Sequence, residues 1–544
     1  MVGDSQCLNR FHAAKETALG KNFDVVIIGS GFGGAVSACR LAEKGMNVLV
    51  LERGRRWQTS DYPRAPGDPW IYDHSCPEKL NGWIDLRVYD DITIAQGAGV
   101  GGGSLIYANV SVEPKRELFN QGWPAEITYD ELKPYYDRVG KMLNLQTIPE
   151  GQITRRFNLM KEGAEALGYG SRFRPLPLAV TFHPGWNYDL DDPHNDKHSQ
   201  KWINEQGQEQ GTCVHCGNCD IGCQVKAKNT LDLNYIPLAE KHGATIRPLH
   251  LVTSIKPEKG GYRVFFDRLE NGERIPGSEI TERVIISAGS LGSTELLLRC
   301  REQHRTLPHL SKFLGRDWSS NGDFLTPAIQ TKREISPTRG PTITCAIDFL
   351  DGSVDHQQFF IEDGGFPDVL GDFLEAKLKS GTSHPKGKLV IEALRRLVRS
   401  RDPLGDVMPW FAQGIDAANG RLYLGRTWYA PWRRPLNLKW EIERSEGVIN
   451  AIVKMHERLA RATDGTPLVP PTWTILKNLI TPHPLGGCNM GTTPENGVVN
   501  HRGEVFGYPN LFVADGAIIP EAVGLNPSKT IAALAERIAD LMNS

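Results

Sequence analysis

The chain has 544 residues, and its 62 Lys and Arg and 64 Asp and Glu give a formal net charge of −2 at pH 7. This balance excludes the strong positive charge typical of nucleic-acid-binding proteins, so we expect no nucleic-acid partner. Hydrophobic residues make up 40% of the chain, which is typical of a soluble globular protein, and the length predicts two or three structural units.

The start of the chain carries no predicted targeting segment. Residues 1–22 contain charges throughout and lack an apolar core, so we expect no signal peptide. Further along, no apolar run approaches the roughly 18 residues that a membrane span needs. We therefore expect a cytoplasmic protein.

The stretch from Asn22 to Gly54 contains a predicted strand, a glycine-rich turn, a helix and a second strand. The β-branched run Asp24–Ile28 is typical of a parallel strand buried on both faces, and a helix is predicted over Ala35–Lys44. The G-x-G-x-x-G turn between them allows a close backbone approach to a pyrophosphate, and the helix N-terminus supplies N–H groups for it. Glu52, at the end of the second strand, can accept from ribose hydroxyls. Rather than a purely structural βαβ unit, we predict a dinucleotide site that includes Gly29, Gly31, Phe32, Gly33, Gly34, Glu52 and Arg53.

A second glycine-rich stretch covers Gln96–Ser104. So many glycines cost backbone entropy, and contact between the backbone and a ligand is the usual reason to accept that cost. A flexible linker is the alternative, but apolar neighbours such as Ile92 and Val110 argue against it. We therefore add Gly99, Gly102, Gly103, Ser104 and Asn109 to the predicted site.

Four further elements are predicted in the middle of the chain: helices over Trp123–Asn144 and Ala227–Gly243, and strands over Thr245–Ile255 and Tyr262–Asp267. The first helix begins at Thr128 or Asp130. A second strand, glycine turn and helix follow over Glu282–Leu298, whose small residues would let the backbone pass close to the same dinucleotide. A purely structural unit is the alternative. These elements add Val252, Ala288 and Gly289 to the predicted site.

Residues 323–440 differ in character, with more aromatics and alternating segments such as Gln357–Glu362, and predict strands of a separate sheet. Lys377–Arg401 is basic and predicts a helix. We interpret it as a solvated face, with a peripheral contact to an anionic membrane as the alternative.

The C-terminal part again has the glycine-rich sequence pattern of an α/β domain, and it ends in a predicted helix up to Met542. His483 lies in a loop that contains prolines on both sides of it, which make the backbone rigid, and glycines, which leave room around its imidazole ring. Asn526 precedes Pro527, so its backbone is held extended and its amide is aimed.

Seven stretches, in this order, resemble the glucose–methanol–choline oxidoreductases, a family of FAD enzymes, and most closely their cholesterol-oxidase branch. They are VVIIGSGFGGAV, GAGVGGGSLIYANVSVEPKR, VIISAGSLGSTELLLR, WSSNGDF, HPLGGCNMG, NLFVADGAIIP and GLNPSKTIAALAERI. The resemblance implies that the dinucleotide is FAD. It also implies an α/β fold: a Rossmann-like FAD-binding domain, bipartite in sequence, and a second α+β substrate domain built on a mixed or antiparallel sheet.

On this basis we divide the chain into five segments. They are 1–150, the first part of the FAD-binding domain; 151–223, an excursion with a Cys-rich turn; 224–322, the second FAD-binding part; 323–440, the substrate domain; and 441–544, the C-terminal FAD-binding and catalytic part.

The resemblance also implies catalytic residues. Alcohol oxidation needs the hydroxyl proton removed as hydride leaves for flavin N5, so a base and a hydrogen-bond partner must flank the reacting carbon. By the family pattern His483 and Asn526 face the flavin in these roles. Glu362 is a third catalytic candidate, because its short stretch resembles the one that carries a substrate-domain glutamate in cholesterol oxidases. The predicted cofactor site is completed by Asp515, Gly516, Asn526 and Pro527.

Four of the ten cysteines crowd into Cys213–Cys223, with the C-x₂-C-x₂-C-x₃-C spacing of bacterial ferredoxins. Unlike a ferredoxin, the chain has Gln224 after the fourth cysteine and no second run. Three interpretations stay open: a structural thiol-rich turn or disulfide, a zinc site, or an iron–sulfur cluster held by Cys213, Cys216, Cys219 and Cys223.

Together these features predict an FAD-dependent oxidoreductase that takes hydride from a secondary alcohol, sterol-like or otherwise bulky and hydrophobic. The electron acceptor is O₂, or a protein or quinone if the cysteines hold a cluster. A flavin-binding electron-transfer or binding protein without alcohol chemistry is the remaining alternative, and the presence of both His483 and Asn526 argues against it.

Overall fold

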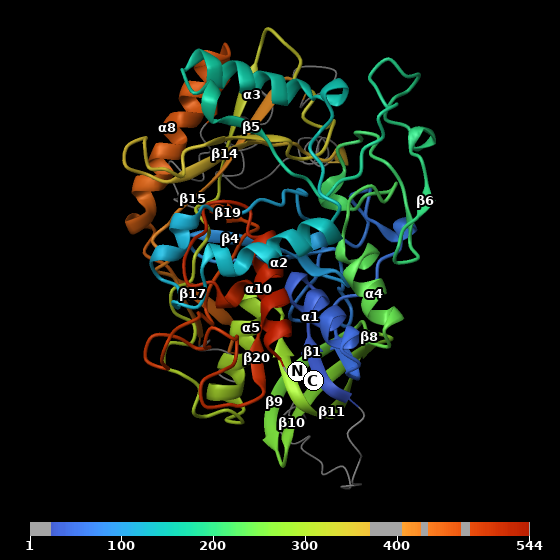
Figure 1. The fold of residues 1–544 in the computed structure, drawn as a ribbon, viewed down its shortest axis with the longest axis vertical. Helices are drawn as coiled ribbons and strands as arrows, with labels where there is room; N and C mark the ends of the chain where they lie inside the picture. The colour runs from blue at the N-terminus through green and yellow to red at the C-terminus, as the bar shows by residue number, and fades with distance from the viewer. Residues whose placement is uncertain (1–22, 370–404, 426–433, 469–478, 543–544) are drawn as a thin grey trace, which may run out of the picture.

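The computed structural model describes residues 23–369, 405–425, 434–468 and 479–542. Two large sheets organise the fold (Figure 1). A seven-stranded sheet occupies the lower half of the view and a six-stranded sheet the upper half; we call them the lower and the upper sheet. A small three-stranded sheet lies between them.

The lower sheet has the strand order β8-β2-β1-β11-β10-β9, with β20 also beside β11. Neighbours among β8, β2, β1, β11 and β20 run parallel, while β9 and β10 form an antiparallel meander onto β11. The strands are β1 (Phe23–Ile28), β2 (Val48–Leu51), β8 (Thr245–Arg247), β9 (His250–Glu258), β10 (Gly261–Glu270), β11 (Glu273–Ile286) and β20 (Leu511–Val513).

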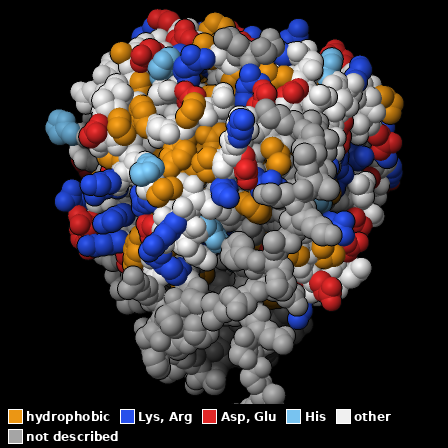
Figure 2. Space-filling model, turned by 90° about the horizontal axis from the view of Figure 1, so that it is seen from below, with side chains coloured by type: hydrophobic (Ala, Val, Ile, Leu, Met, Phe, Trp, Pro, Cys, Tyr) orange, Lys and Arg blue, Asp and Glu red, His pale blue; other side chains and the backbone are white. Residues whose placement is uncertain are grey.

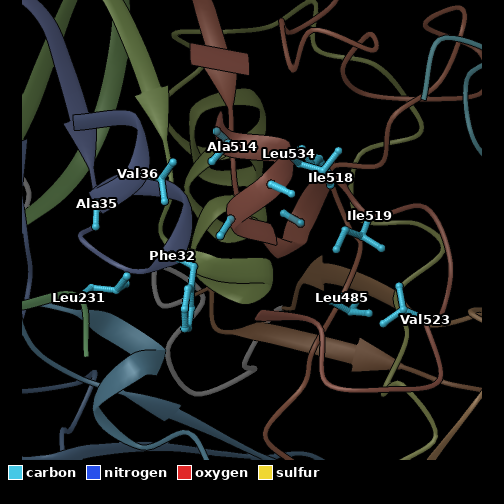
Figure 3. Packing of buried hydrophobic residues seen from close by; sticks show 14 of the residues in the cluster. Phe32, Ala35, Val36, Leu231, Leu485, Ala514, Ile518, Ile519, Val523 and Leu534 are labelled. Atoms are coloured by element: carbon cyan, nitrogen blue, oxygen red, sulfur yellow. The ribbon is translucent and has the colours of Figure 1, made fainter. Parts of the chain in front are cut away.

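Helices cover this sheet and form the main core. They are α1 (Phe32–Glu43), α2 (Tyr129–Met142), α4 (Tyr235–Lys241), α5 (Gly289–Leu298) and α10 (Ser528–Leu541). α1 packs against α4 and α10, and α10 packs against α2. Small residues on α1, such as Ala35 and Ala38, are fully buried and allow this close approach. Figure 3 shows Phe32, Ala35 and Val36 of α1 in the same core as Leu534 of α10.

The predicted elements of this region are largely confirmed, with two corrections. The helix expected over Ala227–Gly243 is wrong in its first half, because Lys228 pairs with Val180 in an antiparallel bridge and α4 begins only at Tyr235. The strand expected over Thr245–Ile255 is interrupted at Leu249, whose φ of 58° turns the chain between β8 and β9. The helix expected from Trp123 is α2, and Thr128 caps it by accepting from the backbone N–H of Glu131 at 3.1 Å.

The upper sheet is antiparallel throughout, with the order β18-β12-β15-β14-β13-β5. Its strands are β5 (Phe173–Pro175), β12 (Phe324–Gln330), β13 (Cys345–Asp348), β14 (Phe359–Asp363), β15 (Val407–Gly414) and β18 (Gly465–Pro467). Helices α3 (Arg155–Ala166) and α8 (Glu446–Ala462) pack on it. The edge strands β5 and β18 come from outside residues 323–440, so this sheet is wider than the predicted substrate segment. The five-segment division remains a proposal.

The small middle sheet joins two predicted functional segments. It contains β3 (Ile84–Val88), β4 (Ile92–Gly97) and β19 (Leu479–Thr481), with β4 parallel to β19. β4 leads into the second glycine-rich stretch, and β19 leads to His483. Two short hairpins complete the strands: β6 (Trp202–Ile203) with β7 (Glu209–Gln210), and β16 (Arg421–Leu424) with β17 (Leu436–Lys439).

The underside of the molecule carries side chains of both charges (Figure 2). Lys and Arg gather toward the left edge of that view, Asp and Glu are scattered over the face, and apolar side chains lie between them near its middle. Within the described part of the chain, no helix has the length and apolar character needed to cross a membrane. The predicted basic helix Lys377–Arg401 falls in 370–404, outside the described residues.

Candidate active site

A cavity of about 930 Å³ is lined by residues of the lower, middle and upper sheets and of the loops that follow them. That volume is in the range of small-molecule and cofactor sites. The predicted site residues on its wall are Gly29, Gly31, Phe32, Gly33, Glu52, Arg53, Gly102, Gly103, Val252, Ala288, Gly289, His483, Asp515, Gly516, Asn526 and Pro527. Five others lie off the wall: Gly34, Gly99, Ser104, Asn109 and Glu362.

The glycines of the first turn have different surroundings. A Cβ on Gly33 would lie 1.5 Å from the carbonyl oxygen of Ala514, and one on Gly34 would lie 2.0 Å from that of Gly29, so both positions serve close packing of α1. A Cβ on Gly31 would meet only the Cα of Gly102, at 3.9 Å. The backbone at the start of α1 is therefore open to the cavity, as a pyrophosphate cradle requires.

Glu52 and Arg53 lie on the cavity wall next to this turn. Glu52 accepts from the backbone N–H of Ser30 at 3.0 Å, from its hydroxyl at 2.7 Å and from the backbone N–H of Gly54 at 2.9 Å. A carboxylate has about four acceptor positions, so this one is oriented and still able to accept from a ribose. Arg53 instead pairs with Asp85 at 2.8 Å and lies over the ring of Tyr72.

The second glycine-rich stretch is anchored from behind. Ser104 donates to the carbonyl oxygen of Gly101 at 2.7 Å and accepts from the backbone N–H of Leu231 at 3.1 Å. Asn109 is fully buried, with a φ of 70°, and neither polar atom of its amide has a partner among the described residues. A buried, unpaired amide beside a cavity wall fits a site that a polar cofactor completes.

Asp515 joins two elements at the same wall. One of its oxygens accepts from the backbone N–H of Gly289 at 2.8 Å and from the hydroxyl of Ser293 at 2.5 Å, and the other accepts from the backbone N–H of Ala517 at 2.8 Å. Burial raises the pKa of Asp515 to about 6. The side chain thus fixes the start of α5 against the loop after β20.

His483 reaches the cavity just beyond β19. Its Nδ1 lies 3.0 Å from both carboxylate oxygens of Asp323, which is 1% exposed. Thr481 supports the pair: its hydroxyl donates to Asp323 at 2.5 Å and accepts from the backbone N–H of His483 at 2.9 Å. Since Nδ1 is engaged by Asp323, Nε2 is the nitrogen that can serve a substrate.

The electrostatics of this pair favour a basic imidazole. Burial opposes the charged ring, but the charge and hydrogen bond of Asp323 outweigh it and raise the pKa of His483 above its ordinary value. Burial also raises the pKa of Asp323, against the stabilising effect of His483. A histidine held by a buried acid is an effective general base.

Glu362 and Asn526 lie together beside this pair. Glu362, on β14, is fully buried and accepts from the side-chain amide of Gln413 at 2.8 Å and from that of Asn526 at 3.4 Å. Both bonds use one carboxylate oxygen, and the other has no partner within the described part of the chain. Burial raises the pKa of Glu362 to about 8. The structure therefore brings the three predicted catalytic residues into one neighbourhood, where Glu362 is largely protonated at neutral pH.

Sequence reasoning missed two residues of this neighbourhood, Asp323 and Gln413. Both are buried polar residues beside apolar strand residues, Asp323 directly before β12 and Gln413 within β15. A polar residue in such a run is a usable signal, because buried polar groups need partners. The signal does not say which partner.

The Cys213–Cys223 turn does not form a ligand set. None of the four cysteines forms a disulfide. The described residues contain no group of three His, Cys, Asp or Glu side chains that could hold a metal ion. The residues present therefore do not fit the iron–sulfur or zinc interpretations.

Comparison with known proteins gives family matches at both ends of the chain. The family model described as GMC oxidoreductase matches residues 417–535, and the one described as NAD(P)-binding Rossmann-like domain matches residues 27–75. A pyridoxine 4-oxidase from Mesorbium loti has a similar fold, with a TM-score of 0.61 at 15% identity over 95% of this chain and 99% of that one.

Two relatives are similar over almost their whole length. The chain is 30% identical over 541 residues to a cholesterol oxidase of Acinetobacter baumannii, which covers 95% of this chain and 93% of the relative. It is 32% identical over 550 residues to a cholesterol oxidase of Mycobacterium tuberculosis, which covers 96% and 91%. With this identity over nearly full length, the protein belongs to the GMC oxidoreductase family and is an oxidoreductase that acts on the CH–OH group of its donors.

Proposed function

We propose that this protein uses FAD to oxidise a secondary alcohol, either a sterol or another bulky hydrophobic alcohol, and passes the electrons to O₂. The observation that carries the proposal is that His483 lies on the wall of the cavity that also contains the dinucleotide cradle and is held from behind by the buried Asp323. A base beside a dinucleotide is the arrangement that alcohol oxidation needs.

The dinucleotide cradle supports FAD as the bound group. It would be held by the open backbone at Gly31 and the start of α1, by Glu52 at the ribose end, and by the wall that includes Gly289 and Asp515. When bound, FAD supplies the hydride acceptor, its N5 atom.

The protein's own residues supply the proton chemistry. Nε2 of His483 takes the hydroxyl proton of the substrate, while Asp323 holds the other ring nitrogen and stabilises the imidazolium that forms. Asn526 lines the cavity beside His483, and its side-chain amide positions the alcohol oxygen. The raised pKa of Glu362, about 8, makes its ionised form a stronger base than an ordinary glutamate. Its unpaired oxygen can therefore take a proton from the carbon beside the new carbonyl group and return that proton to another carbon of the product, as an isomerisation would require.

Apolar side chains support a hydrophobic substrate. They form much of the wall on the side of the upper and middle sheets, at Leu325, Ile343, Phe366, Phe411 and Ile480. Two relatives at 30% and 32% identity are named cholesterol oxidases, which makes a sterol the first substrate to test. O₂ is proposed as acceptor since the described cysteines offer no cluster site for a linked dehydrogenase.

The test is an anaerobic titration of the purified holoenzyme with cholesterol, a long-chain primary alcohol and a sugar. We expect cholesterol to bleach the flavin absorbance, and readmitted air to restore it with formation of H₂O₂. Bleaching by the sugar alone would refute the hydrophobic substrate. Bleaching by cholesterol without reoxidation by air would replace O₂ with a protein or quinone acceptor.

A further inference from the structure

The cysteine-rich turn, Cys213–Cys223, contributes residues to the cavity wall although its thiols form no metal site. Asp220 and Ile221, in the middle of the turn, both line the cavity wall. Both residues lie between Cys219 and Cys223 in the sequence, so the last two cysteines of the run flank the two residues on the cavity wall.

The backbone of this turn is fixed at four consecutive carbonyl groups. Lys228 donates to the carbonyl oxygen of Cys219 at 2.6 Å, and the indole N–H of Trp83 donates to that of Asp220 at 3.2 Å. Arg64 donates to the carbonyl oxygens of Ile221 and Gly222, at 2.6 and 2.7 Å. Such anchoring of a loop lowers the entropy cost of presenting its side chains to a ligand.

Among the described residues, one neighbour forms a hydrogen bond with the side chain of Asp220. The hydroxyl of Thr342 donates to its Oδ1 at 3.2 Å, and no group among the described residues donates to its Oδ2. Thr342 and Ile343 line the same wall, as do Gly364 and Gly365 directly after β14, the strand of Glu362. Asp220 therefore lies beside the part of the cavity wall that these segments of the upper sheet form.

An acid on an apolar wall is costly unless a ligand pairs with it. Burial raises the pKa of Asp220 to about 6, so the group is largely ionised at neutral pH and acts as a hydrogen-bond acceptor. The charge of buried Lys228 stabilises the Asp220 carboxylate through space. Lys228 donates its hydrogen bonds to the carbonyl groups of Leu105, Tyr107 and Cys219 and not to Asp220, so the carboxylate still has an oxygen that a ligand can use.

We propose that Asp220 binds a second hydrogen-bond donor of the substrate, a hydroxyl or an amine, remote from the alcohol that is oxidised. This inference rests on the proposed function and narrows it: the preferred substrate is amphipathic, with an apolar body and polar groups at both ends. A hydrocarbon at that end would leave the carboxylate unpaired, so the site would discriminate against it.

Equilibrium binding tests the assignment without turnover. The oxidised holoenzyme is titrated with two ketosteroids that differ only in a hydroxyl on the ring farthest from the ketone, and with a third that carries an amine there. Each Kd is read from the perturbation of the flavin spectrum. We expect the hydroxyl and amine compounds to bind about 10- to 100-fold more tightly than the plain ketone, as one charge-assisted hydrogen bond provides. A stronger preference for the amine would identify an ammonium group as the donor, and a stronger preference for the hydroxyl an alcohol.

Variants separate recognition from structure. Asp220→Leu should abolish both preferences and leave the Kd of the plain ketone unchanged within about twofold, whereas Asp196→Asn, an exposed charge change in the same segment, should alter neither. In the wild type the preference should weaken as the pH falls through about 6, where the carboxylate of Asp220 becomes protonated.

Equal weakening of all three ligands in Asp220→Leu would show a structural role and overturn the proposal. So would equal Kd values for the three ligands in the wild type, or no binding of any of them. A wild-type enzyme that binds these ligands with the expected preference but is not reduced by the matching steroid alcohols would refute the proposed function and leave the assignment of Asp220 standing.

Discussion

Replacing Asp323 with Asn tests whether the buried acid sets the base strength of His483. The substitution keeps the size of the side chain but removes the charge that lies 3.0 Å from Nδ1 of His483. It also lets an amide N–H compete for Nδ1, which would leave the substrate-facing Nε2 carrying the proton. A charge-assisted hydrogen bond is worth about 1.5–3 kcal/mol, so flavin reduction should slow about 10- to 150-fold.

The pH dependence supplies a second readout. His483 must be neutral to accept the hydroxyl proton, so the rate of flavin reduction should rise as the pH rises through the pKa of this histidine. Asp323 raises that pKa above the ordinary value. In Asp323→Asn the rise should therefore move to lower pH, while the plateau rate falls.

The assay is anaerobic stopped-flow reduction of the holoenzyme over a range of pH. His483→Ala sets the lower limit and should slow reduction about 10²- to 10⁴-fold, the usual contribution of a positioned base. His356→Ala, a change at an exposed histidine, is the control and should reduce at the wild-type rate. A wild-type rate in His483→Ala, or a slower Asp323→Asn with an unshifted pH profile, would refute this reasoning.

Three further variants separate the other roles. Glu362→Gln should lose isomerisation of a sterol product while keeping some oxidation, measured by product chromatography. Glu362→Gln should also raise the Tm at pH 7. Burial raises the pKa of Glu362 from 4.5 in the unfolded chain to about 8 in the folded protein, so this residue destabilises the fold increasingly as the pH rises above 4.5. At neutral pH the loss of unfolding free energy is about 3 kcal/mol, and Gln, which does not ionise, removes it. A Tm gain of the same size at pH 4 would contradict that origin. Asn526→Leu should slow flavin reduction with the cofactor still bound, and loss of the flavin absorbance would instead indicate a structural role. Glu52→Ala should weaken FAD retention by about 1.5–3 kcal/mol in a cofactor titration, with Glu52→Gln losing less; an unchanged affinity in both would mean that the acid does not meet the ribose.

The parts of the fold that follow from the sequence are those with local causes. The β1–α1–β2 unit could be predicted because a β-branched run, a glycine turn and a small-residue helix each have a short-range signature. The first half of the helix expected over Ala227–Gly243 could not, since the bridge between Val180 and Lys228 holds it extended. That contact joins residues far apart in sequence and overrides the local helical pattern.

The same distinction applies to the site. His483 and Asn526 stand in motifs that mark them individually, whereas the partnership of His483 with Asp323 spans 160 residues and has no trace in either local sequence. Glu362 could be proposed from the short stretch of sequence around it. Its raised pKa could not, because that pKa depends on burial between two neighbouring strands, which only the strand order of the sheet creates.

The cysteine run shows why spacing alone can mislead about chemistry. Four thiols within eleven residues predict ligands if the side chains converge, yet here the backbone turns tightly at Gly217 and Gly222, both with positive φ, and the carbonyl groups between them are the atoms that are bound. None of the four thiols forms a disulfide, and the turn places Asp220 on the cavity wall. Since tight turns and metal sites both bring residues close together at short spacing, the discriminating evidence is which atoms converge. In this chain the described thiols do not converge into a metal site, and three different side chains, Lys228, Trp83 and Arg64, bind the carbonyl oxygens of the turn.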